Sequence, residues 1–481
     1  MNRQITRITT VVLVLFGALF VNLNVITMLN ADDIANHPGN RRIIIREYAI
    51  ERGPIVVGEE AIARSVPSEG QYAYLRTYPD AELYAHLTGY YSIVLQRSGL
   101  EAALNEDLTG RSTEVVAQNL GELLGGSDRP GNAVELTIDP AVQRAARDAL
   151  GDREGAIVAL NPRTGAVLAS YANPSFDPNP LSSHDPATIN EAWLPLRDAD
   201  ERPLVDRATR ELYAPGSTFK VITSAAALES GLEPTSSFPD EVVYDVPQTD
   251  ADIGNFAGGV CAGGDTINLA DAFRVSCNTV FARLGVELGD QVLIDQAERF
   301  GFNAVPPYEL SVVASAIPGE LDVPASAQSA IGQRDVRATT MQMALVAASI
   351  ANGGPIMVPH VVAAVRDPDG QRLRSADVRR WTELPGNGVP VSPRTAEQLR
   401  TMMLTTVRSG TGTRAAIDGV DVGGKTGTAQ TAGDPTAWFI GFAGQDVAVA
   451  VVVPEAGPGG TGGGTAAPIA RAVLDAAARG R

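Results

Sequence analysis

The chain has very little lysine. Lysine and arginine together make up 38 of its 481 residues, but only Lys220 and Lys425 are lysines. An arginine keeps its proton in a folded protein, whereas a desolvated lysine can release one. The shortage shows that lysine is not a general surface charge in this sequence, and it makes these two residues the first candidates for chemistry.

Histidine is scarce as well. None of the four histidines has a cysteine or a second histidine at the spacing of a metal site. We therefore expect no bound metal and no zinc chemistry. The histidines are interpreted as packing or surface residues: His37, His86, His184 and His360.

Basic residues are fewer than acidic residues in this chain. The chain has 56 acidic residues against 38 basic ones, a formal net charge of −18, and no cluster of basic residues. This balance argues against a nucleic acid as partner. Hydrophobic residues make up 44% of the chain, enough for a sizeable core, which excludes disorder as the main state.

Long apolar runs are rare, and only one can span a membrane. Residues 8–29 contain no charged side chain and are long enough for a transmembrane helix. Arginines precede the run and aspartates follow it, which predicts that residues 1–7 stay in the cytoplasm and the rest lies outside. The run is longer than the apolar part of a signal peptide, and no small-residue cleavage site follows it. We therefore expect an anchor that is not removed.

Beyond the anchor the sequence divides at a turn-rich stretch, residues 127–132. Residues 30–132 form a first unit without a catalytic constellation. Residues 133–481 alternate helical patterns with strand-like runs, which predict an α+β domain with an antiparallel sheet flanked by helices. The expected strands are 156–160 and 166–172, which form a hairpin, and 423–430, 437–441 and 447–453, with a closing helix over 466–478.

The first candidate motif contains Ser217 and Lys220, three residues apart at the expected start of a helix. This spacing places both side chains on one face. The positive end of a helix favours a developing anion, and a buried lysine can accept the proton of the serine because desolvation lowers its pKa. The pair predicts a nucleophile with its base, but a capping serine beside a solvated lysine would have the same sequence.

The second motif contains Ser276 and Asn278, with Cys277 between them. It separates two apolar helical stretches, 269–275 and 280–284. A hydroxyl and an amide at such a turn can relay a proton and hold a substrate carbonyl. By itself the pattern also fits an ordinary capping turn.

The third motif is the segment Lys425-Thr426-Gly427-Thr428, on an expected strand. A fixed positive charge with hydroxyls suits a substrate carboxylate, and Gly427 allows close approach to the backbone. Together with Gly419 and Gly424, the segment also fits the phosphate-loop pattern. That pattern requires a following helix, whereas an apolar strand follows here, so we disfavour nucleotide binding.

The order and spacing of the three motifs resemble those of class B penicillin-binding proteins, and more narrowly their actinobacterial A-type members. Two departures are visible. Arg334 stands where the family usually has glycine, and Cys277 fills the middle of the second motif; neither removes a reacting group. Further matching stretches are 155–160, 162–165, 176–179, 213–220, 331–333 and 342–344.

The resemblance implies a penicillin-binding transpeptidase domain preceded by a smaller pedestal domain that docks partners. It implies a D,D-transpeptidase without a cofactor that cross-links peptidoglycan stem peptides and is acylated by β-lactams. Nothing before residue 140 looks like a glycosyltransferase, so a membrane partner in the growth or division machinery would polymerise the glycan.

The resemblance also assigns roles to residues. Ser217 would attack the carbonyl between two terminal D-alanines, and Lys220 would accept its proton. Ser276 would pass a proton to the departing D-alanine, and Asn278 would hold the substrate amide. The terminal carboxylate would be bound by Lys425, Thr426 and Thr428, and the backbone N–H groups of Ser217 and Thr428 would form an oxyanion hole.

The only two cysteines, Cys261 and Cys277, both fall on the outer side of the predicted membrane. An isolated pair in an oxidising compartment usually bonds, so we expect a disulfide, with two buried thiols as the alternative. A loop of this size contributes roughly 3 kcal/mol on the chain-entropy model. The bond would also hold the turn of the second motif.

Two classes of rival function are considered, a β-lactamase or carboxypeptidase on the same scaffold and a non-catalytic β-lactam binder. A β-lactamase of this type needs a deacylating glutamate followed by asparagine four residues later, and no glutamate between residues 276 and 340 has one. A carboxypeptidase stays open, because the choice of water or an amine as acceptor depends on pocket shape. A non-catalytic β-lactam sensor would need a cytoplasmic output domain, and only seven residues precede the predicted span.

Overall fold

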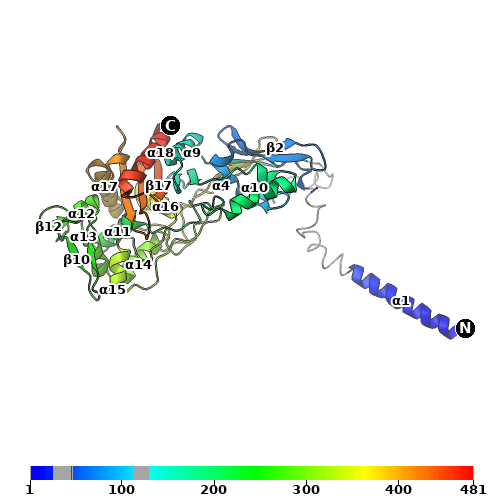
Figure 1. The fold of residues 1–481 in the computed structure, drawn as a ribbon, viewed down its shortest axis with the longest axis horizontal. Helices are drawn as coiled ribbons and strands as arrows, with labels where there is room; N and C mark the ends of the chain where they lie inside the picture. The colour runs from blue at the N-terminus through cyan, green and yellow to red at the C-terminus, as the bar shows by residue number, and fades with distance from the viewer. Residues whose placement is uncertain (1, 25–44, 46, 112–128, 480–481) are drawn as a thin grey trace.

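A computed structural model describes residues 2–24, 45, 47–111 and 129–479. Its first helix, α1 (Asn2–Asn24), lies apart from the folded body (Figure 1). Among the described residues it is the one helix long and apolar enough to cross a membrane, with a mean hydropathy of 1.9 and no buried surface. The end of the predicted anchor, residues 25–29, lies outside the described residues.

The part of the body that follows in sequence is built on a six-stranded sheet, here called the pedestal sheet, of order β14-β13-β6-β1-β2-β3. Three short helices and a small hairpin accompany it. The strands are β1 (Ile55–Val57), β2 (Glu60–Pro67), β3 (Tyr74–Thr77), β6 (Ala133–Leu136), β13 (Val362–Arg366) and β14 (Arg372–Ser375); the helices are α4 (Ala81–Thr88), α5 (Gly99–Ala103) and α6 (Asn105–Leu108); the hairpin is β4 (Tyr91–Ser92) with β5 (Gln96–Arg97).

The pedestal sheet joins distant parts of the chain. Strand β6 runs parallel to β1, and β13 pairs antiparallel with the other side of β6. The division expected between residues 132 and 133 therefore falls immediately before a strand of this sheet, and two further strands arrive from beyond residue 360. Strands from the second unit therefore complete the sheet of the first unit.

A buried ion cluster stabilises the pedestal. The Glu101 carboxylate accepts from Arg52 Nε at 2.5 Å and from Arg76 Nε at 2.6 Å, and it is fully buried. Burial alone would raise the pKa of Glu101, but the two guanidinium groups outweigh this effect and lower it. Removing Glu101 would leave two buried cations without a partner.

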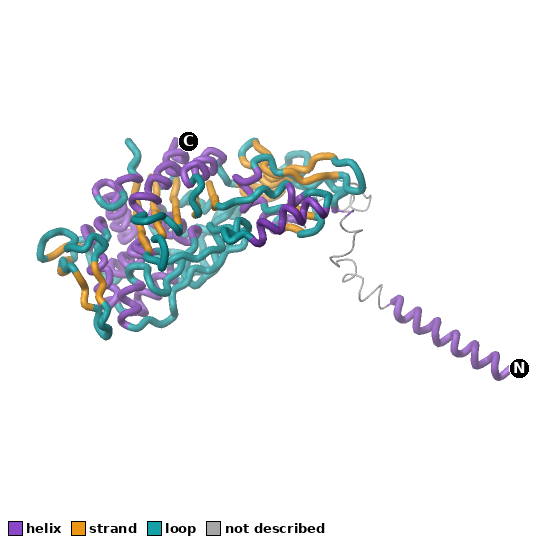
Figure 2. The backbone as a smooth tube through the Cα atoms, in the orientation of Figure 1, coloured by secondary structure: helices purple, strands orange, loops and turns teal. Residues whose placement is uncertain are grey.

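The rest of the body surrounds a second sheet, here called the central sheet, of order β15-β16-β17-β7-β8, antiparallel throughout. The pedestal and central sheets form two separate groups of strands (Figure 2). The predicted hairpin and the three late strands are confirmed, with ends that differ by at most two residues from those expected: β7 (Gly155–Leu160), β8 (Val167–Asn173), β15 (Val422–Ala429), β16 (Thr436–Ala443) and β17 (Val447–Val453).

Helices cover both faces of the central sheet. The helices α9 (Pro140–Leu150) and α18 (Ala467–Arg479) pack against each other and the sheet, and α16 (Thr340–Ala351) packs against β7, β16 and β17. Every residue of α16 and of β16 is buried, which accounts for their continuous apolar sequence. The α+β architecture with helices flanking an antiparallel sheet is confirmed.

Whereas α10 (Pro186–Asp198) lies beside the pedestal helix α4, the other remaining helices and two small hairpins extend the domain beyond the edge strand β15 (Figure 1). This region supplies two of the three motifs. The helices are α11 (Lys220–Glu229), α12 (Leu269–Val275), α13 (Asn278–Leu288), α14 (Asp290–Arg299), α15 (Val323–Ser329) and α17 (Pro393–Ser409); the hairpin strands are β9 (Ser237–Pro239) with β12 (Thr266–Asn268), and β10 (Val243–Asp245) with β11 (Asp252–Gly254).

Candidate active site

The structure brings the three motifs together around one hydroxyl group. Lys425 Nζ donates to Ser276 Oγ at 2.9 Å, and Lys220 Nζ lies 3.4 Å from the same oxygen. Lys220 Nζ also donates to Asn278 Oδ1 at 2.7 Å and to the Ser276 carbonyl at 2.8 Å. The only two lysines of the chain thus converge on one serine.

The serine of the first motif lies in a short 3-10 turn, Gly216–Phe219, that leads directly into α11. The sequence predicts a regular helix from Ser217, whereas the α-helix begins at Lys220. Ser217 is half-buried, and Lys220, one turn later, is fully buried. The turn therefore leaves Ser217 partly accessible while it places Lys220 in the core.

The backbone of this turn is fixed by its neighbours. Gly216 has a φ of +51°, and its N–H donates to the Gly332 carbonyl at 2.9 Å. The space beside its Cα is bounded by the backbone of Thr428 and Ala429, each 3.0 Å from the position that a Cβ would take there. The two segments expected to supply oxyanion-binding N–H groups are therefore neighbours.

Both lysines lie in apolar surroundings. Lys220 Nζ lies 5.3 Å from the ring centre of Phe281, and Lys425 Nζ lies 5.6 Å from that of Phe273. Each side chain is fully buried, and the structure gives neither a carboxylate partner within ion-pair distance among the described residues. Uncompensated burial is the condition under which an ammonium group loses its proton.

Burial lowers the pKa of both lysines. Desolvation brings the pKa of Lys425 to about 7. The pKa of Lys220 falls well below its usual value, first through desolvation and then through the charge of Lys425. The repulsion between the two ammonium groups is mutual, so loss of a proton from one lysine favours retention of the proton on the other. The pair can therefore hold one neutral amine and one cation at the same time.

The third motif lies on β15 and is paired along its length with β16. Because another strand follows instead of a helix, the phosphate-loop alternative is wrong. A Cβ at Gly427 would lie 2.7 Å from the Pro215 carbonyl, so this glycine makes room for the turn that carries Ser217. The hydroxyl of Thr426 pairs with that of Thr411 at 2.6 Å, and Thr428 Oγ1 accepts from the Gly462 N–H at 3.2 Å.

The second motif is held in a strained backbone conformation. Ser276 has φ +63° and ψ +41°, a left-handed backbone conformation that residues other than glycine rarely adopt. It ends α12 and directs its hydroxyl between the lysines. Such strain persists only where the surroundings enforce it.

A disulfide and an asparagine hold this turn. Cys277 is bonded to Cys261 with an S–S distance of 2.09 Å. Asn255 Oδ1 accepts from the backbone N–H groups of Asn278 at 3.0 Å and Thr279 at 3.1 Å. Asn255 thereby caps the N-terminus of α13, where Cys277 supplies no side-chain cap. The role of Asn255 was not predictable from the sequence, because a cap borrowed from a distant loop leaves no local signal.

One group of described residues combines carboxylate and sulfur atoms at metal-ligand distances, namely Asp240, Cys261 and Cys277. Both sulfur atoms are committed to the disulfide. The Asp240 carboxylate accepts from the backbone N–H groups of Cys261 at 2.6 Å and of Ala262 at 2.7 Å. The disulfide and the Asp240 carboxylate therefore hold this loop in place.

Comparison with known proteins decides the family. The sequence profile of the penicillin binding protein transpeptidase domain matches residues 155–475. The chain belongs to this family. The profile of the penicillin binding protein A dimerisation domain matches residues 52–134, which form much of the pedestal.

Relatives of the family align over the full chain. The peptidoglycan D,D-transpeptidase PbpA of Mycolicibacterium smegmatis is 39% identical, over 100% of this chain and 99% of that protein. The protein of the same name from Mycobacterium tuberculosis is 37% identical, over 100% of both chains. A solved ceftriaxone acyl-enzyme complex of penicillin-binding protein A from M. tuberculosis superposes with a TM-score of 0.86 at 38% identity, covering 90% of this chain and 99% of that one.

The structure explains one departure from the family pattern. Arg334, where the family usually has glycine, has a φ of +58°. The backbone there keeps the conformation that suits glycine. The arginine side chain is exposed and pairs with Asp322 at 3.3 Å and Asp335 at 3.4 Å, so the substitution leaves the geometry of the turn in place.

Replacing Asn255 by alanine is expected to slow acylation of Ser217. The variant loses the cap of α13, worth about 1 kcal/mol, and frees the backbone of Asn278. Asn255→Asp keeps the acceptor oxygen and should retain more of the acylation rate than Asn255→Ala. Time-resolved labelling with a fluorescent penicillin, together with thermal unfolding, measures both effects. Equal acylation by all three proteins would show that the cap does not position the second motif.

Proposed function

We propose that this protein is a membrane-anchored D,D-transpeptidase that cross-links peptidoglycan stem peptides through an acyl-enzyme on Ser217. One observation carries the proposal: two buried lysines and an asparagine meet around the hydroxyl of Ser276, and one of these lysines, Lys220, follows the accessible Ser217 by one turn. Membership of the transpeptidase family and the names of its full-length relatives support it.

In the first step Ser217 Oγ attacks the carbonyl carbon between two terminal D-alanines of a donor stem. The neutral Lys220 amine accepts the hydroxyl proton. The N–H groups of Ser217 and Thr428, on neighbouring segments, are proposed to stabilise the oxyanion. The C–N bond then breaks, and the proton held by Lys220 passes through the hydroxyl of Ser276, placed between the lysines, to the departing D-alanine nitrogen, which leaves Lys220 neutral again.

Substrate binding is proposed to use the edge strand β15. A protonated Lys425 supplies positive charge toward the terminal carboxylate, while Thr426 and Thr428 offer hydroxyl groups on the same strand. Asn278 is proposed to hold the peptide amide. Its Oδ1 accepts from Lys220 and its Nδ2 donates to the Gly254 carbonyl at 3.1 Å, so it exchanges partners when substrate arrives.

In the second step an amine of a neighbouring stem attacks the ester carbonyl of the acyl-enzyme. Lys220 accepts a proton from the attacking amine, and the proton returns to Ser217 Oγ as the ester bond breaks. The product is a new amide bond between two stems, and the free serine is regenerated. β-Lactams are proposed to acylate the same serine, as the solved complexes of the M. tuberculosis relative describe for that protein.

The arrangement of the whole protein is proposed as follows. Residues 1–7 are cytoplasmic, residues 8–29 anchor the chain, and the catalytic domain faces the exterior. Residues 30–132 form the pedestal, completed by strands β6, β13 and β14, and residues 133–481 form the transpeptidase domain. The chain itself carries no glycosyltransferase activity and works with a membrane glycosyltransferase partner. Peptidoglycan and β-lactams, not nucleic acids, are its ligands.

The pH dependence of acylation is expected to be bell-shaped. Lys220 acts as a base only above its own lowered pKa, whereas Lys425 attracts an anion only below its pKa of about 7. Second-order acylation by a penicillin, measured by stopped-flow, should therefore fall as the pH rises above about 7. In Lys425→Arg the alkaline decline should disappear, because arginine stays charged. An unchanged alkaline limb in that variant would assign it to another group.

The activity itself is tested with the full chain in detergent. A stem peptide ending in D-Ala-D-Ala is supplied with an amino acceptor, and mass spectrometry detects the cross-linked product and free D-alanine. Ser217→Ala serves as the blank. Product formation only by the wild type supports the proposal. Release of D-alanine without cross-linking would indicate a carboxypeptidase, and the absence of both products and of penicillin labelling would refute the proposed chemistry.

A further inference from the structure

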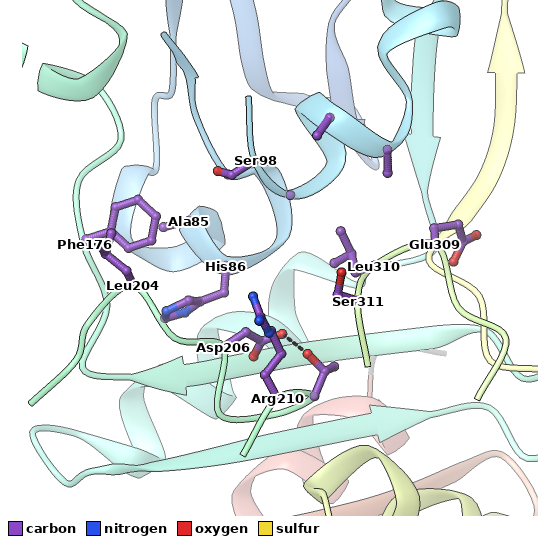
Figure 3. A pocket seen from close by; sticks show the side chains of 15 residues that line it. Ala85, His86, Ser98, Phe176, Leu204, Asp206, Arg210, Glu309, Leu310 and Ser311 are labelled. Atoms are coloured by element: carbon purple, nitrogen blue, oxygen red, sulfur yellow. Dashed lines mark hydrogen bonds between the residues drawn. The ribbon is translucent and has the colours of Figure 1, made fainter. Parts of the chain in front are cut away.

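A cavity of about 530 Å³ lies at the junction of the pedestal and the transpeptidase domain, away from the three motifs. The pedestal contributes His86, Ser98 and Ala102 from the α4–α5 region, and the transpeptidase domain contributes Arg210 and Ser311 (Figure 3). Its volume lies within the range of small-molecule sites. The cavity is therefore large enough for a ligand that would touch both domains at once.

The carboxylates that line the cavity are already satisfied. Asp206 accepts from the Ala208 N–H at 2.9 Å and from Thr209 Oγ1 at 2.7 Å. Glu309 accepts from the backbone N–H groups of residues 361 and 362 at 3.0 and 3.1 Å. Both oxygens of each group are engaged in holding loops, although the two carboxylates keep their negative charge because all four donors are neutral.

The uncommitted charge in the cavity is Arg210. Its side chain extends into the space between His86 and Ser311 (Figure 3). Within the described part of the chain its guanidinium group forms no hydrogen bond or ion pair. His86 Nε2 lies 2.9 Å from the Pro203 carbonyl, which can only accept, and burial lowers the pKa of its imidazole. His86 is therefore neutral, and the free cation is the arginine.

Apolar side chains form one part of the remaining wall, and the hydroxyl groups of Ser98, Thr209 and Ser311 belong to the rest. The ring of Phe176 lies edge-on against His86 at 5.7 Å, and Leu204, Leu310 and Ala85 line the same space. An apolar wall with one free guanidinium group suits a molecule that combines a carboxylate with a small apolar body.

We propose that this interdomain cavity is a second binding site, distinct from the transpeptidase site, for a small carboxylate with an apolar or alanyl body. Arg210 pairs with the carboxylate of the ligand, and the side chains of Phe176 and Leu204 pack against its apolar part. Two sources share this chemistry, the C-terminus of a short peptide and the head of a short acyl chain. The residues that follow Arg210 lead directly to Ser217, so the ligand would rest on the segment that carries the nucleophile.

The test uses the full chain in detergent with Ser217 already acylated by penicillin G, so that carboxylates cannot bind at the transpeptidase site. Saturation-transfer NMR titrations follow hippurate and its neutral amide, hippuramide. We expect hippurate to bind and hippuramide to bind at least about tenfold more weakly, since it lacks the charge-assisted pair. Arg210→Gln should weaken hippurate binding by a similar factor.

Two further variants control for folding. Ala102→Phe places a ring in the cavity from an exposed position and should remove hippurate binding, whereas Arg471→Gln on α18 changes an exposed arginine elsewhere and should leave it intact. Acylation by penicillin should be unchanged in all three variants. Two results would overturn the proposal. One is the absence of hippurate binding by the wild type, and the other is hippurate binding as tight as that of the wild type by both Arg210→Gln and Ala102→Phe.

The source of the carboxylate is separated by two additional probes, acetyl-alanyl-alanine and hexanoate. Tighter binding of the peptide supports a peptide C-terminus as the ligand, and tighter binding of hexanoate supports an acyl chain. In either case Arg210→Gln must weaken the better probe. If that variant binds both probes as the wild type does, the site is not an anion site.

Discussion

Replacing Lys220 by arginine is expected to slow the acylation of Ser217 by roughly 10²–10⁴-fold, the usual contribution of a general base. Arginine keeps a positive charge but cannot release its proton. Its longer side chain also enters a fully buried position next to Phe281, where the space is filled. The rate of labelling with a fluorescent penicillin, with thermal unfolding as a check of integrity, measures the loss.

The matched control for this variant is Lys425→Arg. Its proposed role needs a positive charge and not a removable proton, so arginine preserves the required property although it also overfills a buried site. We expect its acylation rate at pH 6 to exceed that of Lys220→Arg by at least about tenfold. Equal losses in both variants would show that the assignment of base and anchor is wrong.

Replacing Gly332 by alanine is expected to cost about 3 kcal/mol of stability and to lower acylation about a hundredfold. The residue has a φ of +73°, and an added Cβ would lie 2.0 Å from the carbonyl oxygen of Gly216. Relief of this collision must move Gly216, which directly precedes the nucleophile. A shift of the nucleophile of even about 1 Å is costly to reaction geometry.

Gly353 offers a control with the same backbone conformation. Its φ is +74°, and nothing lies within 4 Å of an added Cβ. Gly353→Ala should therefore lose only the conformational part, about 1–2 kcal/mol, and keep its acylation rate. Differential scanning calorimetry and penicillin labelling compare the two variants. If both acylate at the wild-type rate, the contact between Gly332 and Gly216 does not position Ser217.

Local patterns in the sequence were sufficient for much of the transpeptidase domain. The predicted apolar stretch before the second motif corresponds to α12 with identical ends, Leu269–Val275, and the early hairpin is the pair β7 and β8. The α+β architecture followed from the same patterns. These elements are visible in sequence because their apolar periodicity reports directly on which face is buried.

Features that depend on distant partners were not predictable in this way. The pairing of β6 with β13 joins strands that no local pattern connects, and the Glu101 cluster depends on arginines brought in by folding. The left-handed backbone of Ser276 is set by its surroundings, including Asn255 and the disulfide. Residue types predicted which chemical groups would form the site, but only the packing shows that both lysines are buried without a carboxylate partner among the described residues.

The interleaved pedestal sheet has a consequence for how the chain is made. A ribosome releases β1, β2, β3 and β6 long before it reaches β13 and β14, which cover the open edge of β6. Between these events the newborn chain must display an unpaired strand edge, which invites wrong pairing. The whole central part of the transpeptidase domain is synthesised during that interval. The pedestal therefore cannot complete its sheet until most of the transpeptidase domain has been synthesised. A stalled or truncated chain should be sensitive to proteases in both domains.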